Sequence, residues 1–183
     1  MGFPTFASGD VLLAADMNAV AGWLVKKVTI GTSVASVPVT GAFSSSYENY
    51  LIVVNGGVGS ASAVMRLTFD SIATGYYYAG VYASYGAAGT AISTAANATS
   101  FADCGSITTN NLNMMCYVYG PNLAKTTQVH YAYAGAATTA GAGGLWLNGG
   151  GYVTSTNQHV DFTLTPSTGT LTGGTVRVYG LRN

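Results

Sequence analysis

Few residues in this chain of 183 could carry acid–base, nucleophilic or metal chemistry: two histidines, two cysteines and six acidic residues. His130 and His159 each fall on the polar side of an alternating stretch, so they could share a metal ion only if two predicted strands were neighbours. No HxH, HExxH or CxxC spacing accompanies them. We therefore predict no metal site and interpret both histidines as surface or subunit-interface residues.

The acidic and hydroxyl residues form no recognisable catalytic motif. The sequence is rich in Ser, but it has no G-x-S-x-G elbow between a strand and a helix. A glycosidase pair of carboxylates would have to come from residues such as Glu48, Asp70, Asp103 and Asp161, which mostly flank predicted strands. The Gly-rich segment 141–144 lacks the Lys-Ser/Thr of a phosphate loop. We predict a non-enzymatic protein with no catalytic residue and no cofactor.

The two cysteines, Cys104 and Cys116, permit a disulfide without implying one. Cys116 lies in an apolar run of residues 114–118, which favours the role of a small buried hydrophobe.

The composition points to assembly. Only 7% of the residues are charged, against about 25% in an ordinary soluble domain, and the formal net charge is zero. A monomer needs surface charge to stay unassociated, so a permanently assembled structural protein is favoured. The only basic pair is Lys26-Lys27, which argues against nucleic acid as a partner. No apolar stretch approaches the roughly 20 residues of a membrane span, and we predict no signal peptide and no membrane partner.

The 13 tyrosines are the side chains that point most clearly to a contact surface. Five of them cluster in ten residues: Tyr76, Tyr77, Tyr78, Tyr82 and Tyr85. Consecutive residues of a strand point to opposite faces, so some of these rings must leave the core. Exposed tyrosines suit contacts with protein partners or sugars. We interpret the cluster as a subunit interface, with receptor contact as the alternative.

The elements that would position these residues divide the chain into two parts. Residues 1–28 are expected to form an extended arm followed by a short helix over 14–27. Its apolar residues fall on one face at helical spacing: Met17, Val20, Ala21, Leu24 and Val28. Such a helix is marginal alone, and its apolar face needs a partner surface.

Residues 29–183 are expected to be mainly β. Alternating apolar residues predict strands around residues 50–54, 64–69, 115–119, 128–133, 159–164 and 176–179, with weaker candidates at 28–30, 76–82, 101–107 and 144–152. Gly-rich turns separate them, and two long loops are predicted at 83–100 and 135–144. Eight to ten short strands at even spacing favour an antiparallel β-sandwich, most simply a jelly roll.

The segment ASGDVLLAADMNAV, residues 7–20, resembles a leader found on bacteriophage fibre, minor tail and head-fibre proteins. The residues that match its pattern are Gly9, Asp10, Val11, Leu12, Ala14, Met17 and Asn18. Leu13 replaces the usual Thr, which removes a side-chain oxygen able to cap the helix, a loss of about 1 kcal/mol. The resemblance implies that this leader anchors the protein to a virion, and Val20 and Leu24 extend the predicted anchoring face.

Two further segments are similar to phage β-sandwich domains. YENYLIV at residues 47–53 resembles an early strand of such domains, and GGTVRVYGL at 173–181 resembles their last strand. The resemblance implies a virion structural protein, made in the host cytoplasm and released by lysis, that assembles as a homotrimer.

Two roles within the virion remain open. The first is a capsid decoration or cement protein bound to the major capsid protein, which the small size and the lack of a coiled-coil shaft favour. The alternative is a tail or fibre-tip protein that binds a host surface glycan or another receptor. A carbohydrate-binding module outside any virion is a third reading, disfavoured by the missing secretion signal.

Overall fold

The structure, a computed structural model, describes residues 22–70, 72–85, 89–135 and 145–181, and these residues form β-strands without a helix. The chain is therefore mainly β, as predicted. The strands are β1 (Gly22–Thr29), β2 (Val37–Val39), β3 (Asn49–Gly59), β4 (Ala63–Phe69), β5 (Tyr76–Ser84), β6 (Ala91–Ala98), β7 (Phe101–Ile107), β8 (Leu112–Tyr119), β9 (Thr127–Ala134), β10 (Leu145–Val153), β11 (Phe162–Pro166) and β12 (Leu171–Leu181).

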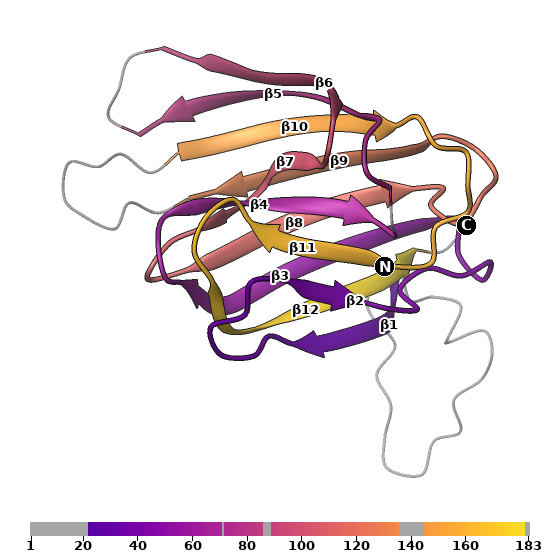
Figure 1. Ribbon diagram of the computed structural model, residues 1–183, viewed down its shortest axis with the longest axis horizontal. Helices are drawn as coiled ribbons and strands as arrows, with labels where there is room; N and C mark the ends of the chain where they lie inside the picture. The colour runs from indigo at the N-terminus through magenta and orange to yellow at the C-terminus, as the bar shows by residue number, and fades with distance from the viewer. Residues whose placement is uncertain (1–21, 71, 86–88, 136–144, 182–183) are drawn as a thin grey trace, which may run out of the picture.

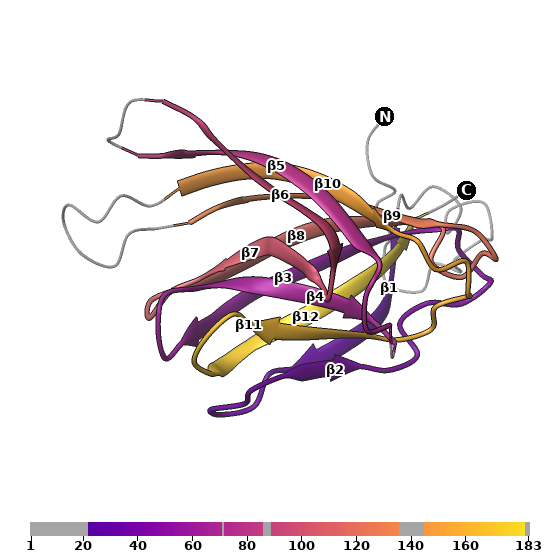
Figure 2. The same ribbon diagram turned by 45° about the horizontal axis from the view of Figure 1, so that its top comes forward.

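All the strands join one open antiparallel sheet (Figure 1). One path through it runs β2-β11-β4-β7-β8-β9-β10-β5-β6. Strand β8 is the junction, because residues 112–114 pair with β7, residues 115–119 pair with β9, and the opposite edge pairs with β3. From β3 the sheet continues through β12 to β1. At one end, hairpin β5–β6, strand β10 and the neighbouring β9 extend away from β4 and β7 (Figure 2).

The sheet curls so that β2, β11 and β4 overlie β12 and β3 (Figures 1 and 2). Phe43, between β2 and β3, bridges the two parts: its ring lies 5.6 Å from that of Phe162 on β11 and 4.9 Å from that of Tyr50 on β3. Alternate residues of β3, β8 and β12 are buried on this inner side. The period-2 pattern in the sequence thus becomes one core face and one outer face.

The glycines of β10 let neighbouring strands approach closely. A Cβ on Gly151 would lie 2.2 Å from the carbonyl oxygen of Tyr77 and 2.9 Å from the ring of Phe101. A Cβ on Gly149 would lie 2.8 Å from the ring of Tyr131. The Gly-rich stretch is therefore a strand interior where bulky neighbours on β5, β7 and β9 fill the space of the missing side chains.

The prediction of an N-terminal helix is wrong for the residues of that segment that the structure describes. Residues 22–27, the end of the predicted helix, belong to β1 and pair with β12. Their apolar spacing fitted a helical period, but pairing along the free edge of β12 satisfies their backbone groups instead. Residues 14–21 lie outside the described part. The long loop predicted at 83–100 is also wrong in part, because β6 occupies residues 91–98.

The other predicted strands that the structure describes are confirmed apart from two boundaries. Strand β1 ends at Thr29, so Ile30 of the candidate at 28–30 lies beyond it. Strand β11 begins at Phe162, so residues 159–161 precede it. In the described ranges we find no helix long and apolar enough to cross a membrane.

Candidate functional site

Most predicted anchoring residues lie outside the described part of the chain: Gly9, Asp10, Val11, Leu12, Ala14, Met17, Asn18 and Val20. Leu24 is described, and it lies on β1, where 52% of it is exposed. The segment that follows the leader is thus fixed to the edge of the sheet through β12.

The five clustered tyrosines do not form a single surface. Tyr76 is fully buried, and its hydroxyl accepts a hydrogen bond from the Phe69 N–H at 2.9 Å. Tyr77 and Tyr85 point away from the core, whereas Tyr78 and Tyr82 pack against it. Alternation along β5 causes this split, as expected for consecutive strand residues.

Tyr77 belongs to an exposed aromatic surface on the sheet, which we call the outer face. It consists of the residues of β12, β3, β8, β9, β10 and β5 that point away from the core. Residues that pair across neighbouring strands form rows on this face, and Leu24 of β1 extends one row through its pairing with Tyr179. The face includes Leu51, Val53, Tyr77, Val81, Met115, Tyr117, Tyr119, Gln128, His130, Trp146, Asn148, Tyr152, Arg177 and Tyr179.

The outer face carries much apolar area and little charge. Five of the eleven large apolar side chains that the described residues leave exposed lie on it, and a sixth, Leu24 of β1, adjoins it; the five are Val81, Met115, Tyr119, Trp146 and Tyr152. Tyr77 stacks on Tyr152 with centroids 5.2 Å apart, and Tyr117 stacks on Tyr119 at 6.4 Å. Its strand residues include no acidic side chain. Apolar patches of this kind mark interaction surfaces.

His130 lies on the outer face, where its strand position is between Tyr117 of β8 and Gly150 of β10. Its Nε2 is 2.8 Å from Oδ1 of Asn148, and its strand position pairs with Tyr117. This agrees with its interpretation as a surface or interface residue.

The interpretation of His159 as a surface residue is wrong. Its side chain is fully buried, stacks on Phe69 at 5.1 Å and has its Nδ1 2.6 Å from Oδ2 of Asp70. Oδ1 of Asp70 accepts hydrogen bonds from the N–H groups of Val160 and Asp161. The pair therefore ties the β10–β11 loop to the end of β4. It is a structural clamp, and the described residues contain no group of three or more His, Cys, Asp or Glu that could hold a metal.

Both cysteines are buried free thiols. Burial raises the pKa of Cys104 and of Cys116, with the nearby Cys116 as a further cause for Cys104. A thiol held in its protonated form is a poor nucleophile, so Cys116 acts as a small buried hydrophobe, as predicted.

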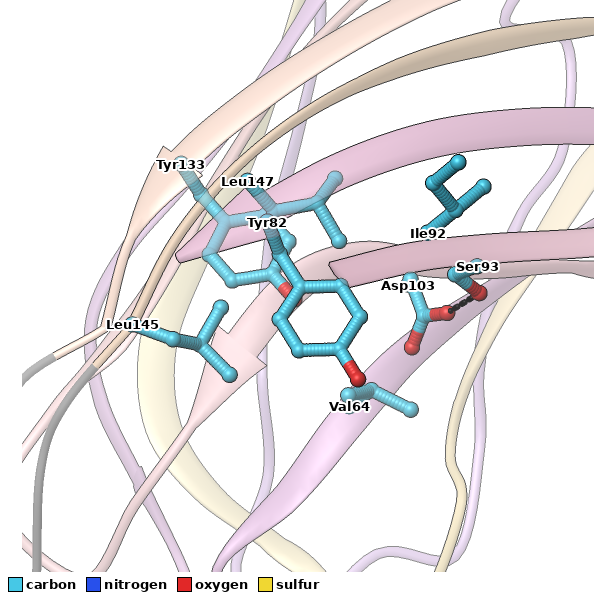
Figure 3. Close-up of a pocket in the computed structure, with 8 residues that line it drawn as sticks. All are labelled: Val64, Tyr82, Ile92, Ser93, Asp103, Tyr133, Leu145 and Leu147. Atoms are coloured by element: carbon cyan, nitrogen blue, oxygen red, sulfur yellow. Dashed lines mark hydrogen bonds between the residues drawn. The ribbon is translucent and has the colours of Figure 1, made fainter. Parts of the chain in front are cut away.

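A pocket of about 290 Å³ opens where hairpin β5–β6 and β10 diverge from β7 and β4 (Figure 3). Tyr82, Leu147 and Tyr133 come from neighbouring strands in one paired row and form one wall. The remaining lining residues are Val64, Ile92, Ser93, Asp103 and Leu145. The lining is apolar and phenolic, with one carboxylate.

A β-bulge supplies that carboxylate. Met65 of β4 pairs with Gly105 of β7, and Leu67 pairs with Phe101, so three residues of β7 face one residue of β4. Asp103, in the middle of the bulge, has a φ of 59°, a left-handed conformation that costs free energy in most non-Gly residues. The bulge turns its side chain toward β6, where the Ser93 hydroxyl donates a hydrogen bond to Oδ2 at 2.6 Å.

The sequence reasoning missed this pocket. It read Asp103 as a solvated strand-flanking residue, and residues 91–98 as loop. The only available signal was the position of an acidic residue inside an apolar strand candidate, because the bulge depends on pairing with a distant strand.

Comparisons with known proteins add no family. No family model, no curated protein and no solved structure matches this chain.

Proposed function

We propose that this chain is a non-enzymatic structural protein of a bacteriophage virion, a trimeric capsid decoration or cement protein. The resemblance of residues 7–20 to phage leaders supports the virion. The main support for the assembly is the outer face, which exposes Met115, Tyr152 and Trp146 and has no acidic side chain on its strands. Protein interfaces are enriched in aromatic residues and Met and depleted in charge at their centres.

We also propose that the sheet is an elaborated jelly roll. With strands numbered along the chain, an eight-stranded jelly roll has the sheet orders 1-8-3-6 and 2-7-4-5. We leave out β1, β8, β9 and β12 and renumber the other eight strands from 1 to 8 along the chain. The order 1-8-3-6 then corresponds to β2-β11-β4-β7, and the order 2-7-4-5 corresponds to β3-β10-β5-β6. Hairpin β8–β9 would then be an insertion between β3 and β10, and β12 with β1 an extension beyond β3. This strand order supports the proposal, since it reproduces the orders of both sheets of a jelly roll.

The role at a tail or fibre tip is the second candidate. The observation in its favour is the pair of exposed tyrosine stacks, Tyr77 on Tyr152 and Tyr117 on Tyr119, beside the polar pair His130–Asn148. Flat aromatic rings with neutral hydrogen-bonding groups suit a host surface glycan.

Immunogold electron microscopy of purified source-phage particles, with antibody to this chain, tests the proposal. Gold over the head shell is the expected result for a decoration protein, and gold at the tail tip would favour the second candidate. Unlabelled particles from cells that express the protein would contradict both virion roles.

The anchoring role can be tested separately by removing residues 1–21 and keeping β1. The shortened chain should still fold and assemble, because β1–β12 pairing is intact, but it should no longer join the particle. A Leu123→Ala variant of the full chain, at an exposed apolar residue of the β8–β9 loop, is the matched control for loss of an apolar residue without loss of the leader. Full incorporation of the shortened chain would contradict the anchor.

A further inference from the structure

The pocket between hairpin β5–β6 and β7 has a chemistry that the proposed structural role does not use. Its walls combine apolar side chains with the phenols of Tyr82 and Tyr133. Its one charged lining group is the carboxylate of Asp103, and no Lys, Arg or His lines it. Figure 3 shows Asp103 on one side of the opening and the Tyr82 ring on the other.

The carboxylate lacks a cationic partner among the described residues. The hydrogen bond from Ser93 contacts Oδ2, and no described Lys, Arg or His makes an ion pair with Asp103. Arg66 is near enough to lower the pKa of Tyr78, yet it makes no ion pair with Asp103. Asp103 is half-buried, and its negative charge beside apolar groups would attract a bound cation more strongly than it would in bulk water.

The phenol of Tyr133 adds no second negative charge to the pocket. Burial raises the pKa of Tyr133, and the adjacent Asp103 raises it further, so this phenol stays neutral and keeps its proton. Neutral aromatic rings attract cations through their faces. The bulge in β7 places the Asp103 side chain toward β6 and the pocket.

We propose that this pocket binds an organic cation with an apolar body, whose ammonium or guanidinium group pairs with Asp103 and whose body packs against Tyr82, Tyr133 and Leu147. Two sources share this chemistry: a small free amine, and a Lys or Arg side chain of another protein. The volume of about 290 Å³ lies near the lower end of ordinary ligand pockets, which suits one ring or one long side chain.

Titration of the full chain with a charge series tests the site. Benzylammonium, benzyl alcohol and benzoate have similar shapes and differ in charge. We expect benzylammonium to bind at least about tenfold more tightly than benzyl alcohol, as one charge-assisted hydrogen bond allows, and benzoate to bind least. High salt should weaken the binding of the cation only. Equal binding of the alcohol and the ammonium, or no binding of the ammonium, would overturn the proposal.

Two variants locate the binding. Asp103→Asn keeps the shape and should weaken benzylammonium binding about tenfold or more. Glu48→Gln removes the same charge outside the pocket and should leave the affinity unchanged. An unchanged affinity in Asp103→Asn would overturn the proposal, and the charge series on the unaltered chain decides the matter if that variant does not fold.

Capped amino acids distinguish the two sources. N-acetylated, C-amidated lysine and arginine carry their cation only on the side chain. Binding comparable to that of benzylammonium would support a partner protein's side chain, and binding of free amines alone would support a small molecule. This test is independent of where the protein sits on a particle.

Discussion

At the scale of single residues, a few polar groups secure the ends of the sheet. His159 and Asp70 form the clearest case, because a fully buried imidazole meets a carboxylate that also accepts two backbone N–H groups. His159 N–H also donates to the carbonyl of Pro121 at 2.7 Å. One residue thereby ties the β10–β11 loop to both the β4 end and the β8–β9 loop.

Asp70→Asn should lower the free energy of unfolding by about 1.5–3 kcal/mol, the usual contribution of a hydrogen bond to a charged group. The left-handed φ of 42° at this position is tolerated by Asn, so the backbone should not add to the loss. Asp161→Asn is the matched control: its Oδ1 accepts one exposed N–H, that of Gly41, and the loss should stay below about 1 kcal/mol. Chemical denaturation measures both, and equal losses would contradict the clamp.

At the scale of elements, the sequence predicted the strands whose side chains alternate between large apolar and polar residues. Strands β3, β4, β8 and β9 are of this kind. It missed β6, because Ala, Ser, Thr and Asn dominate residues 91–98 and give no contrast between faces. The sequence also predicted a helix where β1 lies, because the apolar residues of so short a segment are compatible with either a helix or an edge strand.

The candidate sites show the same limit. The tyrosine cluster was visible as composition, but its division between core and outer face depends on the register of β5 with β10. The pocket depends on a bulge in β7 opposite β4. Such features arise from pairing between distant segments, and local sequence does not encode them.

Close packing through β10 gives a prediction at this scale. Gly151→Ala should destabilise the protein by about 1–3 kcal/mol, since its Cβ would meet the Tyr77 carbonyl and the Phe101 ring. In Gly22→Ala, on β1, the nearest heavy atom would lie at an ordinary 3.5 Å, so stability should change little. Thermal unfolding compares the two variants, and an unaffected melting temperature in Gly151→Ala would contradict the packing described.

At the scale of the whole molecule, the core holds several weak acids in their neutral forms. Burial raises the pKa of Tyr76 to about 12, and it raises the pKa of Tyr131, Cys104 and Cys116 as well. Their ordinary values are 10.0 for Tyr and 9.0 for Cys. Above these values the unfolded chain loses protons that the folded chain keeps, which favours unfolding.

The contribution of these groups to the free energy of unfolding should therefore be constant below about pH 8 and should fall above about pH 9, by up to about 1.4 kcal/mol per pH unit for each such group. Denaturant unfolding at a series of alkaline pH values measures this fall, and tyrosinate absorbance should rise together with unfolding. A constant free energy up to about pH 11 would contradict the neutral buried phenols and thiols.

In the proposed assembly, other copies of the chain cover the outer face. The native mass of the full-length protein tests it most directly. We expect three times the chain mass of 18.6 kDa, with Met115→Glu shifting the mass toward one chain because it buries a charge at the centre of the face. Val160→Glu, a similarly exposed position off the β-strands, should leave the assembly intact. A single-chain mass for the unaltered protein at micromolar concentration would contradict the account.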